Sequence, residues 1–145
     1  MLHLLSAVLL SQNMSPVSSD TDPPKTIQML AMDLSNGGFS ERRFAGRELH
    51  RKARASDRHL QRAASDSLEA LEARKTQAEL RRYAMPACMT QLTEQATALF
   101  CAQLLENLGD PSALPTVQAA LESQDVPRRA RRALRRTESM LQEHP

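Results

Sequence analysis

Histidine and cysteine are the residues of this 145-residue sequence that could bind a metal, transfer protons or attack a substrate near neutral pH. The four histidines are widely separated and form neither an H-E-x-x-H motif nor a comparable cluster; they are His3, His50, His59 and His144. His50 and His59 fall on adjacent predicted helices, so they could approach each other. We expect exposed histidines and no metal site.

The two cysteines, Cys88 and Cys101, could form a disulfide only under one condition. A single pair at this spacing is no zinc motif. If one helix carries both, thirteen steps of about 1.5 Å separate them by roughly 19 Å. A disulfide requires Cα atoms within about 7 Å. We therefore expect two reduced, partly buried thiols, unless the chain breaks between them.

Motifs of catalysis and cofactor binding are absent from the sequence. It contains no G-x-S-x-G, P-loop or G-x-G-x-x-G motif, and no lysine is placed to bind phosphate near Gly37 and Gly38. Carboxylate pairs such as Glu69 and Glu72 are typical of solvated helix faces. Because no nucleophile has a partner base, we expect neither an enzyme nor a cofactor site.

Arginine is the remaining residue type whose clustering could create a functional site. Six arginines lie within nine residues, from Arg128 to Arg136. Residues 84–145 nevertheless have a net charge of −1, residues 1–40 have −2, and residues 41–83 have +5. The basic excess therefore lies in the middle of the chain, which argues against nucleic-acid binding by the C-terminal arginines.

The middle segment holds the best candidate for an interaction patch, over residues 42–62. Its members are Arg42, Arg43, Arg47, Arg51, Lys52, Arg54, Arg58 and Arg62. Such a patch could bind an acidic protein, an anionic membrane or nucleic acid. Alternatively, these residues are solvated helix faces with i,i+4 partners, such as Glu48 and Lys52. The scarcity of aromatic residues argues against binding of single-stranded nucleic acid.

The composition predicts that helices position these side chains. Ala, Leu, Arg, Glu and Gln dominate after residue 40, while the chain has three Phe, one Tyr and no Trp. Strong helix formers therefore outnumber strand formers, and we expect an all-α fold. A chain of this length fits one domain.

Capping residues and apolar periodicity divide the first half into helices. One helix has Pro24 in its first turn, repeats Ile27, Leu30, Ala31 and Leu34 on one face, and ends at Gly37-Gly38. The next has Ser40 as N-cap and Phe39 and Phe44 as a hydrophobic staple. Its Gly46 predicts a close helix crossing. Asp57 caps a short helix, and Asp66 or Ser67 caps another whose apolar side is Leu68, Leu71, Ala78 and Tyr83.

The second half predicts three further helices. The longest has Pro86 in its first turn and ends at Gly109; its apolar face is Leu92, Ala96, Leu99, Phe100 and Leu104. A shorter helix follows with Pro115 near its start. The last is capped by Asp125, with Pro127 near its first position. On it, Val126, Ala130, Ala133, Leu134, Thr137, Met140 and Leu141 fall within an arc of about 120°, opposite the arginines.

A faint internal repeat, offset by 56 residues, aligns Phe44 with Phe100 and Leu49 with Leu105. The segment "LLENLGDPSALPTVQAALESQDVPRRARRALRR" resembles a HEAT repeat. The resemblance implies that Gly109, Asp110 and Pro111 end one helix, and that Asp125 with Arg128 or Arg129 helps to hold adjacent repeats. The segment "LSNGGFSERRFAGRELHRKA" is similar to a bacterial HEAT-like variant, but departs from it at "ARASDRH" and "SLEALEAR". The resemblance covers about residues 29–138.

The first 24 residues differ from the rest. "MLHLLSAVLL" is as long as the apolar core of an export signal, although no basic residue precedes it; it is too short for a membrane span. Residues 11–24 read as a flexible linker. We expect an exported or periplasmic protein if residues 1–20 are a signal, and a cytoplasmic one otherwise. Residues 25–142 form the predicted HEAT-like domain.

The resemblance implies a short α-α superhelix of two or three stacked helix pairs. It also implies a scaffold or protein-interaction module that presents a helical surface to a protein partner. The alternative is a basic module that binds nucleic acid or anionic membrane through residues 42–62. We expect no integral membrane span.

Overall fold

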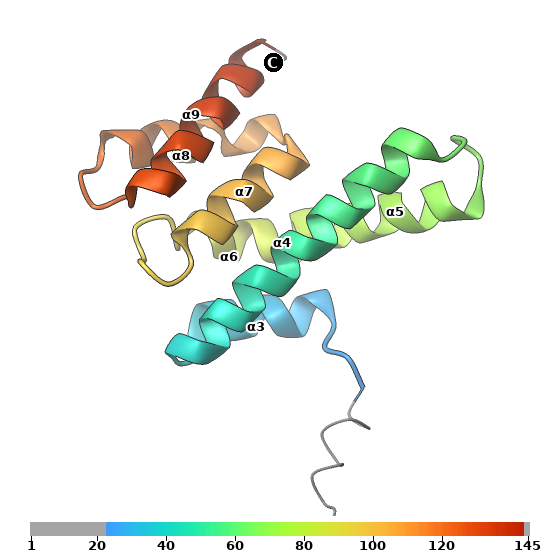
Figure 1. Ribbon diagram of the computed structural model, residues 1–145, viewed down its shortest axis with the longest axis horizontal. Coiled ribbons are helices and arrows are strands. Elements are labelled where there is room, and N and C mark those ends of the chain that lie inside the picture. Colours follow the sequence, from blue (N-terminus) through green and yellow to red (C-terminus); the bar gives the residue numbers. More distant parts are fainter. Residues whose placement is uncertain (1–22, 144–145) are drawn as a thin grey trace, which may run out of the picture.

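The computed structural model describes residues 23–143, and the predictions for residues 1–22 lie outside this range. The all-α prediction is confirmed, because helices account for almost all regular structure and no strand occurs between residues 23 and 143. Figure 1 shows the elements in order: α3 (Ile27–Asn36), α4 (Phe39–Arg62), α5 (Leu68–Glu79), a π-helical turn (Leu80–Ala84), α6 (Met85–Met89), α7 (Ala98–Leu108), a 3-10 turn (Pro111–Ala113), α8 (Leu114–Glu122) and α9 (Arg128–Glu143).

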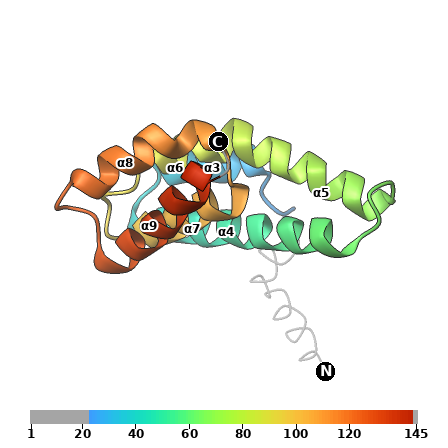
Figure 2. The same ribbon diagram turned by 90° about the horizontal axis from the view of Figure 1, so that it is seen from above.

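The helices pack side by side in two layers, which Figure 2 shows from above. Layer A consists of α4, α7 and α9, and layer B of α3, α5, α6 and α8. Within layer A, α7 packs against both α4 and α9. The chain crosses from one layer to the other at nearly every turn, so each helix buries one side against the other layer.

The three helices of layer A run in the same direction. Along α4 and α7, Arg42 contacts Gln91 just before α7, and Gly46 faces Phe100. Along α7 and α9, Glu106 pairs with Arg136, and Gly109 lies beside Met140 one turn further on. Contacts therefore advance together along each pair of helices, as they do in stacked repeats.

The longest helix, α4, passes through a predicted break. Its buried residues, Ala45, Gly46, Leu49, Ala53 and Ser56, form one stripe that extends into the "ARASDRH" segment, and the half-buried Leu60 continues it by one turn. The prediction that Asp57 caps a separate helix is therefore wrong, because burial of this stripe outweighs the local preference for a cap. The carboxylate of Asp57 instead accepts a hydrogen bond from Gln61 within the helix.

The start of α4 also differs from the prediction. Gly38, not Ser40, is the N-cap, and its backbone N–H donates to the Glu41 carboxylate at 2.9 Å. Phe39 and Phe44 are both exposed and form no hydrophobic staple. The helix begins two residues earlier than predicted. Phe39 therefore lies inside its first turn and not before the N-cap.

The α5 helix confirms its predicted cap but buries another face. The Ser67 hydroxyl accepts a hydrogen bond from the backbone N–H of Ala70. Leu68 and Leu71 are 74% and 51% exposed, so the predicted apolar side is wrong. Ala70, Ala73 and Gln77 are buried instead. Their small or slender side chains let α5 approach α4 more closely than leucines would.

Pro86 lies inside a helix that is continuous from residue 68 to residue 89, widened by the π-helical turn. A proline in a helix has no N–H to donate, and its ring clashes with the carbonyl of the residue four positions earlier. The π-helical turn directly before Pro86 accommodates this clash, since one extra residue in the turn moves that carbonyl away.

The predicted single helix from Pro86 to Gly109 is broken by turns at residues 90–97. The Thr90 hydroxyl donates to the carbonyl of Ala87, and the Gln91 backbone N–H donates to that of Cys88, so side-chain and turn bonds close the helix there. The break changes the buried face: Leu92 and Leu104 are buried, but Ala96, Leu99 and Phe100 are only partly so. Gly109 ends α7 as predicted, with a left-handed φ of 58°.

The last helix packs through the predicted face. Ala130, Ala133, Leu134, Thr137 and Leu141 are buried, and its arginines lie on the opposite side except for Arg131, which is half-buried at the edge of this face. Asp125 is not its cap, because α9 begins at Arg128 and the Pro127 carbonyl accepts its first helical hydrogen bond from Arg131. Pro115 lies in the first turn of α8, as predicted.

Gly46 confirms the predicted close crossing, between α4 and α7. A Cβ atom at this position would lie 3.3 Å from Cβ and Cδ2 of Phe100. We predict that Gly46→Val lowers the free energy of unfolding by about 1–3 kcal/mol, because the branched side chain forces the two helices apart. Urea unfolding followed by circular dichroism measures the change. Gln61→Val, at an exposed position of the same helix, is the matched control, and equal stability of the two variants would contradict the crossing.

Candidate interaction surface

The predicted basic patch becomes a regular stripe on α4. Six of its members are exposed and, at 100° per residue, fall within an arc of about 100° opposite the buried side. They are Arg43, Arg47, Arg51, Arg54, Arg58 and Arg62, which we call the α4 arginine stripe. At about 1.5 Å per residue the stripe is about 29 Å long.

The charge of the α4 arginine stripe is mostly uncompensated. Among residues 23–143, its single ion pair joins Arg51 to Glu48. Arginines without carboxylate partners keep their full positive potential at the surface, which attracts anionic groups. The alternative prediction, in which i,i+4 ion pairs cover this helix face, does not describe the exposed arginines of α4.

Two members of the predicted patch lie off the stripe. Arg42 turns inward, where its guanidinium donates to Gln91 and to Glu94, each at 3.4 Å. The side chain of Gln91 also accepts a hydrogen bond from the buried Thr97 hydroxyl, so Arg42 ties α4 to the 90–97 turns. Lys52 is half-buried and lines a groove between α4 and α5. Arg42 and Lys52 are therefore structural or groove residues.

Layer A carries a second set of exposed arginines, on α9. These are Arg128, Arg129, Arg132, Arg135 and Arg136, and within the described part of the chain only Arg136 forms an ion pair, with Glu106. We call this set and the α4 arginine stripe together the outer arginine face. The sequence prediction missed the contribution of α9, because charges summed along the chain include acidic residues that lie elsewhere in space.

An apolar hollow adjoins the outer arginine face near the start of α4. Its volume is about 270 Å³, and it is lined by Phe39, Arg43, Gln95, Ala96, Leu99 and Phe100. Phe39 is 60% exposed. A hollow of this kind, next to unpaired arginines, suits an apolar side chain of a partner whose neighbouring residues are acidic.

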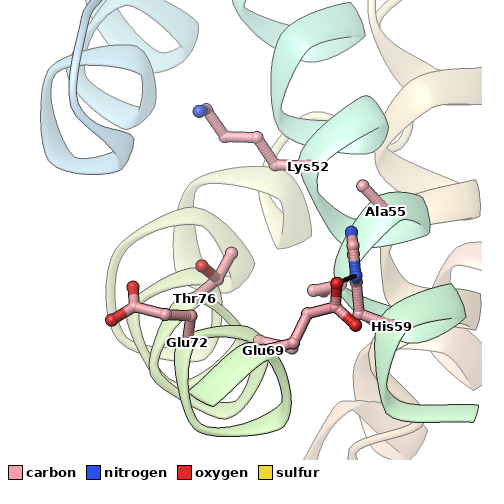
Figure 3. Close-up of a pocket in the computed structure, with 8 residues that line it drawn as sticks. Lys52, Ala55, His59, Glu69, Glu72 and Thr76 are labelled. Carbon is pink, nitrogen blue, oxygen red and sulfur yellow. Dashed lines mark ion pairs between the residues drawn. The ribbon is translucent and has the colours of Figure 1, made fainter. Parts of the chain in front are cut away.

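The groove between α4 and α5 is shown in Figure 3. It has a volume of about 280 Å³ and a floor of Ala55, Ser56 and Ala73. Its one ion pair joins Nδ1 of His59 to a carboxylate oxygen of Glu69 at 3.7 Å, while Glu72 and Lys52 extend from its rim. Both members of the pair are well exposed, and the hydroxyl of Ser56 in the same groove donates to the backbone carbonyl of Ala53 and not to the histidine.

The histidines do not meet. His50 and His59 both lie on α4, nine residues apart, so they point to opposite sides of the helix; the prediction that they occupy adjacent helices is wrong. His50 is half-buried at the crossing with α7, where its ring centroid lies 6.5 Å from that of Phe100. Burial lowers the pKa of His50, and the charge of Arg54 lowers it further. His3 and His144 lie outside the described residues.

The residues to which the HEAT resemblance assigns a structural role lie just before and just after α8. Backbone and side-chain hydrogen bonds from Ser112 hold the pKa of Asp110 below its ordinary value, and Pro111 begins the 3-10 turn. Asp125, Arg128 and Arg129 are exposed.

Two arginines that the sequence analysis did not single out tie the helix ends together. Arg131 donates to the carbonyls of Leu121 and Ser123 at the end of α8, at 2.8 and 2.5 Å. Arg81 donates to the carbonyl of Leu108 at the end of α7. Neither has a sequence signal of its own, because the ends they bind are identified only by the fold.

No protein-family model matches the chain, and no curated protein or solved structure is similar enough to count as a match. Between residues 23 and 143, no group of three or more His, Cys, Asp or Glu side chains is arranged to hold a metal ion. None of the helices in this range is both long enough and apolar enough to cross a membrane.

His50 makes stability depend on pH. Its pKa is lowered in the folded state, so as the pH falls through about 6.5 the unfolded chain takes up a proton before the folded one does. We predict that the free energy of unfolding decreases as pH falls through this window and levels off below the folded-state pKa. Urea unfolding across the window measures the slope.

His50→Gln should reduce that slope, because the variant cannot take up the proton. His59→Gln, on the exposed side of the same helix, is the control and should keep it. A slope that His50→Gln leaves unchanged would show that another group is responsible.

Proposed function

We propose that this chain is a non-catalytic binding module whose outer arginine face binds an acidic surface of a partner protein. The observation that carries the proposal is the arrangement of layer A: eleven exposed arginines on α4 and α9, of which only Arg51 and Arg136 have ion-pair partners among residues 23–143. An uncompensated face of this kind accelerates and orients association with an oppositely charged surface.

The architecture supports a HEAT-like α-solenoid as the scaffold of this module. Successive helices alternate between two layers, and the helices of layer A run in the same direction. The Gly109-Asp110-Pro111 segment ends α7 and leads into α8, which matches the role that the resemblance implies. A stack of helix pairs presents an extended surface, and such surfaces serve partner binding.

The apolar hollow beside Arg43 favours a protein partner over nucleic acid. Protein interfaces combine charged residues with an apolar side chain anchored in a pocket. The hollow offers apolar contacts from Phe39, Leu99 and Phe100. A nucleic-acid duplex presents phosphates outside and keeps its bases stacked inside, so it has no apolar group to place there and would use the arginines alone.

Binding of nucleic acid or an anionic membrane remains the second candidate. The specific observation in its favour is the regular spacing of the α4 arginine stripe over about 29 Å, because regularly placed cations suit a repeating polyanion.

Charge reversal on the stripe tests the proposed function. The probes are a peptide of glutamates around one central phenylalanine, a short random-sequence DNA duplex, and vesicles that contain an anionic phospholipid. We predict that the peptide binds, and that the triple variant Arg43→Glu, Arg47→Glu, Arg54→Glu weakens its binding at least about tenfold, or about 1.4 kcal/mol. Fluorescence anisotropy of the labelled peptide measures the affinity.

The matched control reverses three exposed cations of layer B: Arg74→Glu, Lys75→Glu, Arg82→Glu. It changes the net charge equally and should leave peptide binding nearly intact. Replacing the central phenylalanine of the peptide by alanine should also weaken binding, because the hollow then stays empty. Tighter binding of DNA or vesicles than of the peptide, lost steeply with salt, would favour the second candidate. No binding of any probe at low salt would overturn both.

A further inference from the structure

Cys88 and Cys101 form a buried pair that the break at residues 90–97 brings together. Cys88 lies on α6 in layer B, and Cys101 on α7 in layer A. Both are free thiols, and their exposed fractions are 1% and 0%. Both belong to one buried apolar cluster, on helices that pack against each other, and the Cys101 side chain contributes to raising the pKa of Cys88. The condition under which the sequence allows a bridge, a break between the two residues, is therefore met.

We propose that Cys88 and Cys101 are a redox pair that closes to a disulfide when the chain folds in the presence of a thiol–disulfide oxidant, and that the disulfide links α6 to α7 across the two layers. The proposal is independent of the outer arginine face. It rests on the placement of the two thiols in one core, at the junction of two helices that the chain connects only through the turns at residues 90–97.

The chemistry balances with an oxidant that is itself a disulfide. The thiolate of one cysteine attacks a sulfur of the oxidant and releases one oxidant thiol, which leaves a mixed disulfide. The thiolate of the second cysteine then attacks the protein sulfur of that mixed disulfide, forms the Cys88–Cys101 bond and releases the second oxidant thiol. The protein loses two electrons and two protons, and the oxidant gains them.

Burial of the two sulfur atoms makes conversion between the dithiol and the disulfide slow in the folded protein. Removal from water raises the pKa of Cys88 well above its ordinary value, and the neighbouring Cys101 side chain raises it further, so Cys88 holds almost no thiolate at neutral pH in the folded protein. A soluble oxidant also cannot reach either sulfur atom in the packed core. We therefore infer that the bond forms while the chain folds or opens locally, and that the folded protein keeps whichever form it acquired.

Oxidative refolding of the full chain tests the proposal. The protein is unfolded under reducing conditions and refolded with either oxidised or reduced glutathione. Iodoacetamide is then added in denaturant, and intact mass counts the reactive thiols. Because the chain has only two cysteines, a monomer that lacks both reactive thiols and carries no added glutathione mass must contain the Cys88–Cys101 bond.

We expect refolding with oxidised glutathione to yield a helical monomer without alkylatable thiols and with a higher melting temperature than the dithiol form. The higher melting temperature follows from the constraint that the bond places on the unfolded chain. We also expect the folded dithiol to react with Ellman's reagent much more slowly than the chain in denaturant does.

Three outcomes would overturn the inference: two alkylatable thiols after oxidative refolding, an oxidised monomer that has lost its helical circular dichroism, or fast reaction of the folded dithiol. The double variant Cys88→Ala, Cys101→Ala is the control and should have the same melting temperature after either treatment. If that variant does not fold, thiol counting and circular dichroism on the wild-type chain still decide the question.

Discussion

The close approach of α7 to its neighbours in layer A is the constraint on which the rest of the structure depends. Small residues line both contacts: Ala45 and Gly46 on α4, Ala98 and Cys101 on α7, and alanines on α9. No Phe or Trp lies among the fully buried side chains between residues 23 and 143. The helices therefore gain packing energy by bringing their backbones together, and the stack depends on the absence of bulk at these positions.

Much of the helical framework could be predicted from the sequence, because caps and terminators act locally. Ser67 and Gly109 were identified correctly, since a hydroxyl cap and a left-handed glycine satisfy the ends of any helix. Asp57 does not cap a helix, because a good cap residue is also tolerated inside a helix, and here α4 is held by its buried stripe up to Ser56 and continues to Arg62. The exposure of Leu68 and Leu71 could not be predicted from the α5 sequence alone, because the facing surface of α4 accepts only small side chains.

The sequence predicts the arginines that α4 contributes to the candidate surface, but it does not predict that the arginines of α9 join them. Helical periodicity alone places six arginines on one side of α4, but Arg42 turns away to Gln91 and Glu94, which lie 49 and 52 residues further along the chain. The arginines of α9 lie far from those of α4 along the chain, and net charge by segment argues against a role for them. They join the same surface only because α7 packs between α4 and α9. No local sequence pattern predicts which helices pack against each other.

The common direction of the helices in layer A has an electrostatic consequence. Each helix has a macrodipole with a partial positive charge of about half an electron at its N-terminus. Because α4, α7 and α9 point the same way, these three positive ends gather at one edge of the layer, near Phe39, Ala98 and Arg128. The potential of the outer arginine face is therefore graded along the helices and highest at the edge where the apolar hollow lies. If the partner is acidic, as proposed, this gradient would orient it before contact.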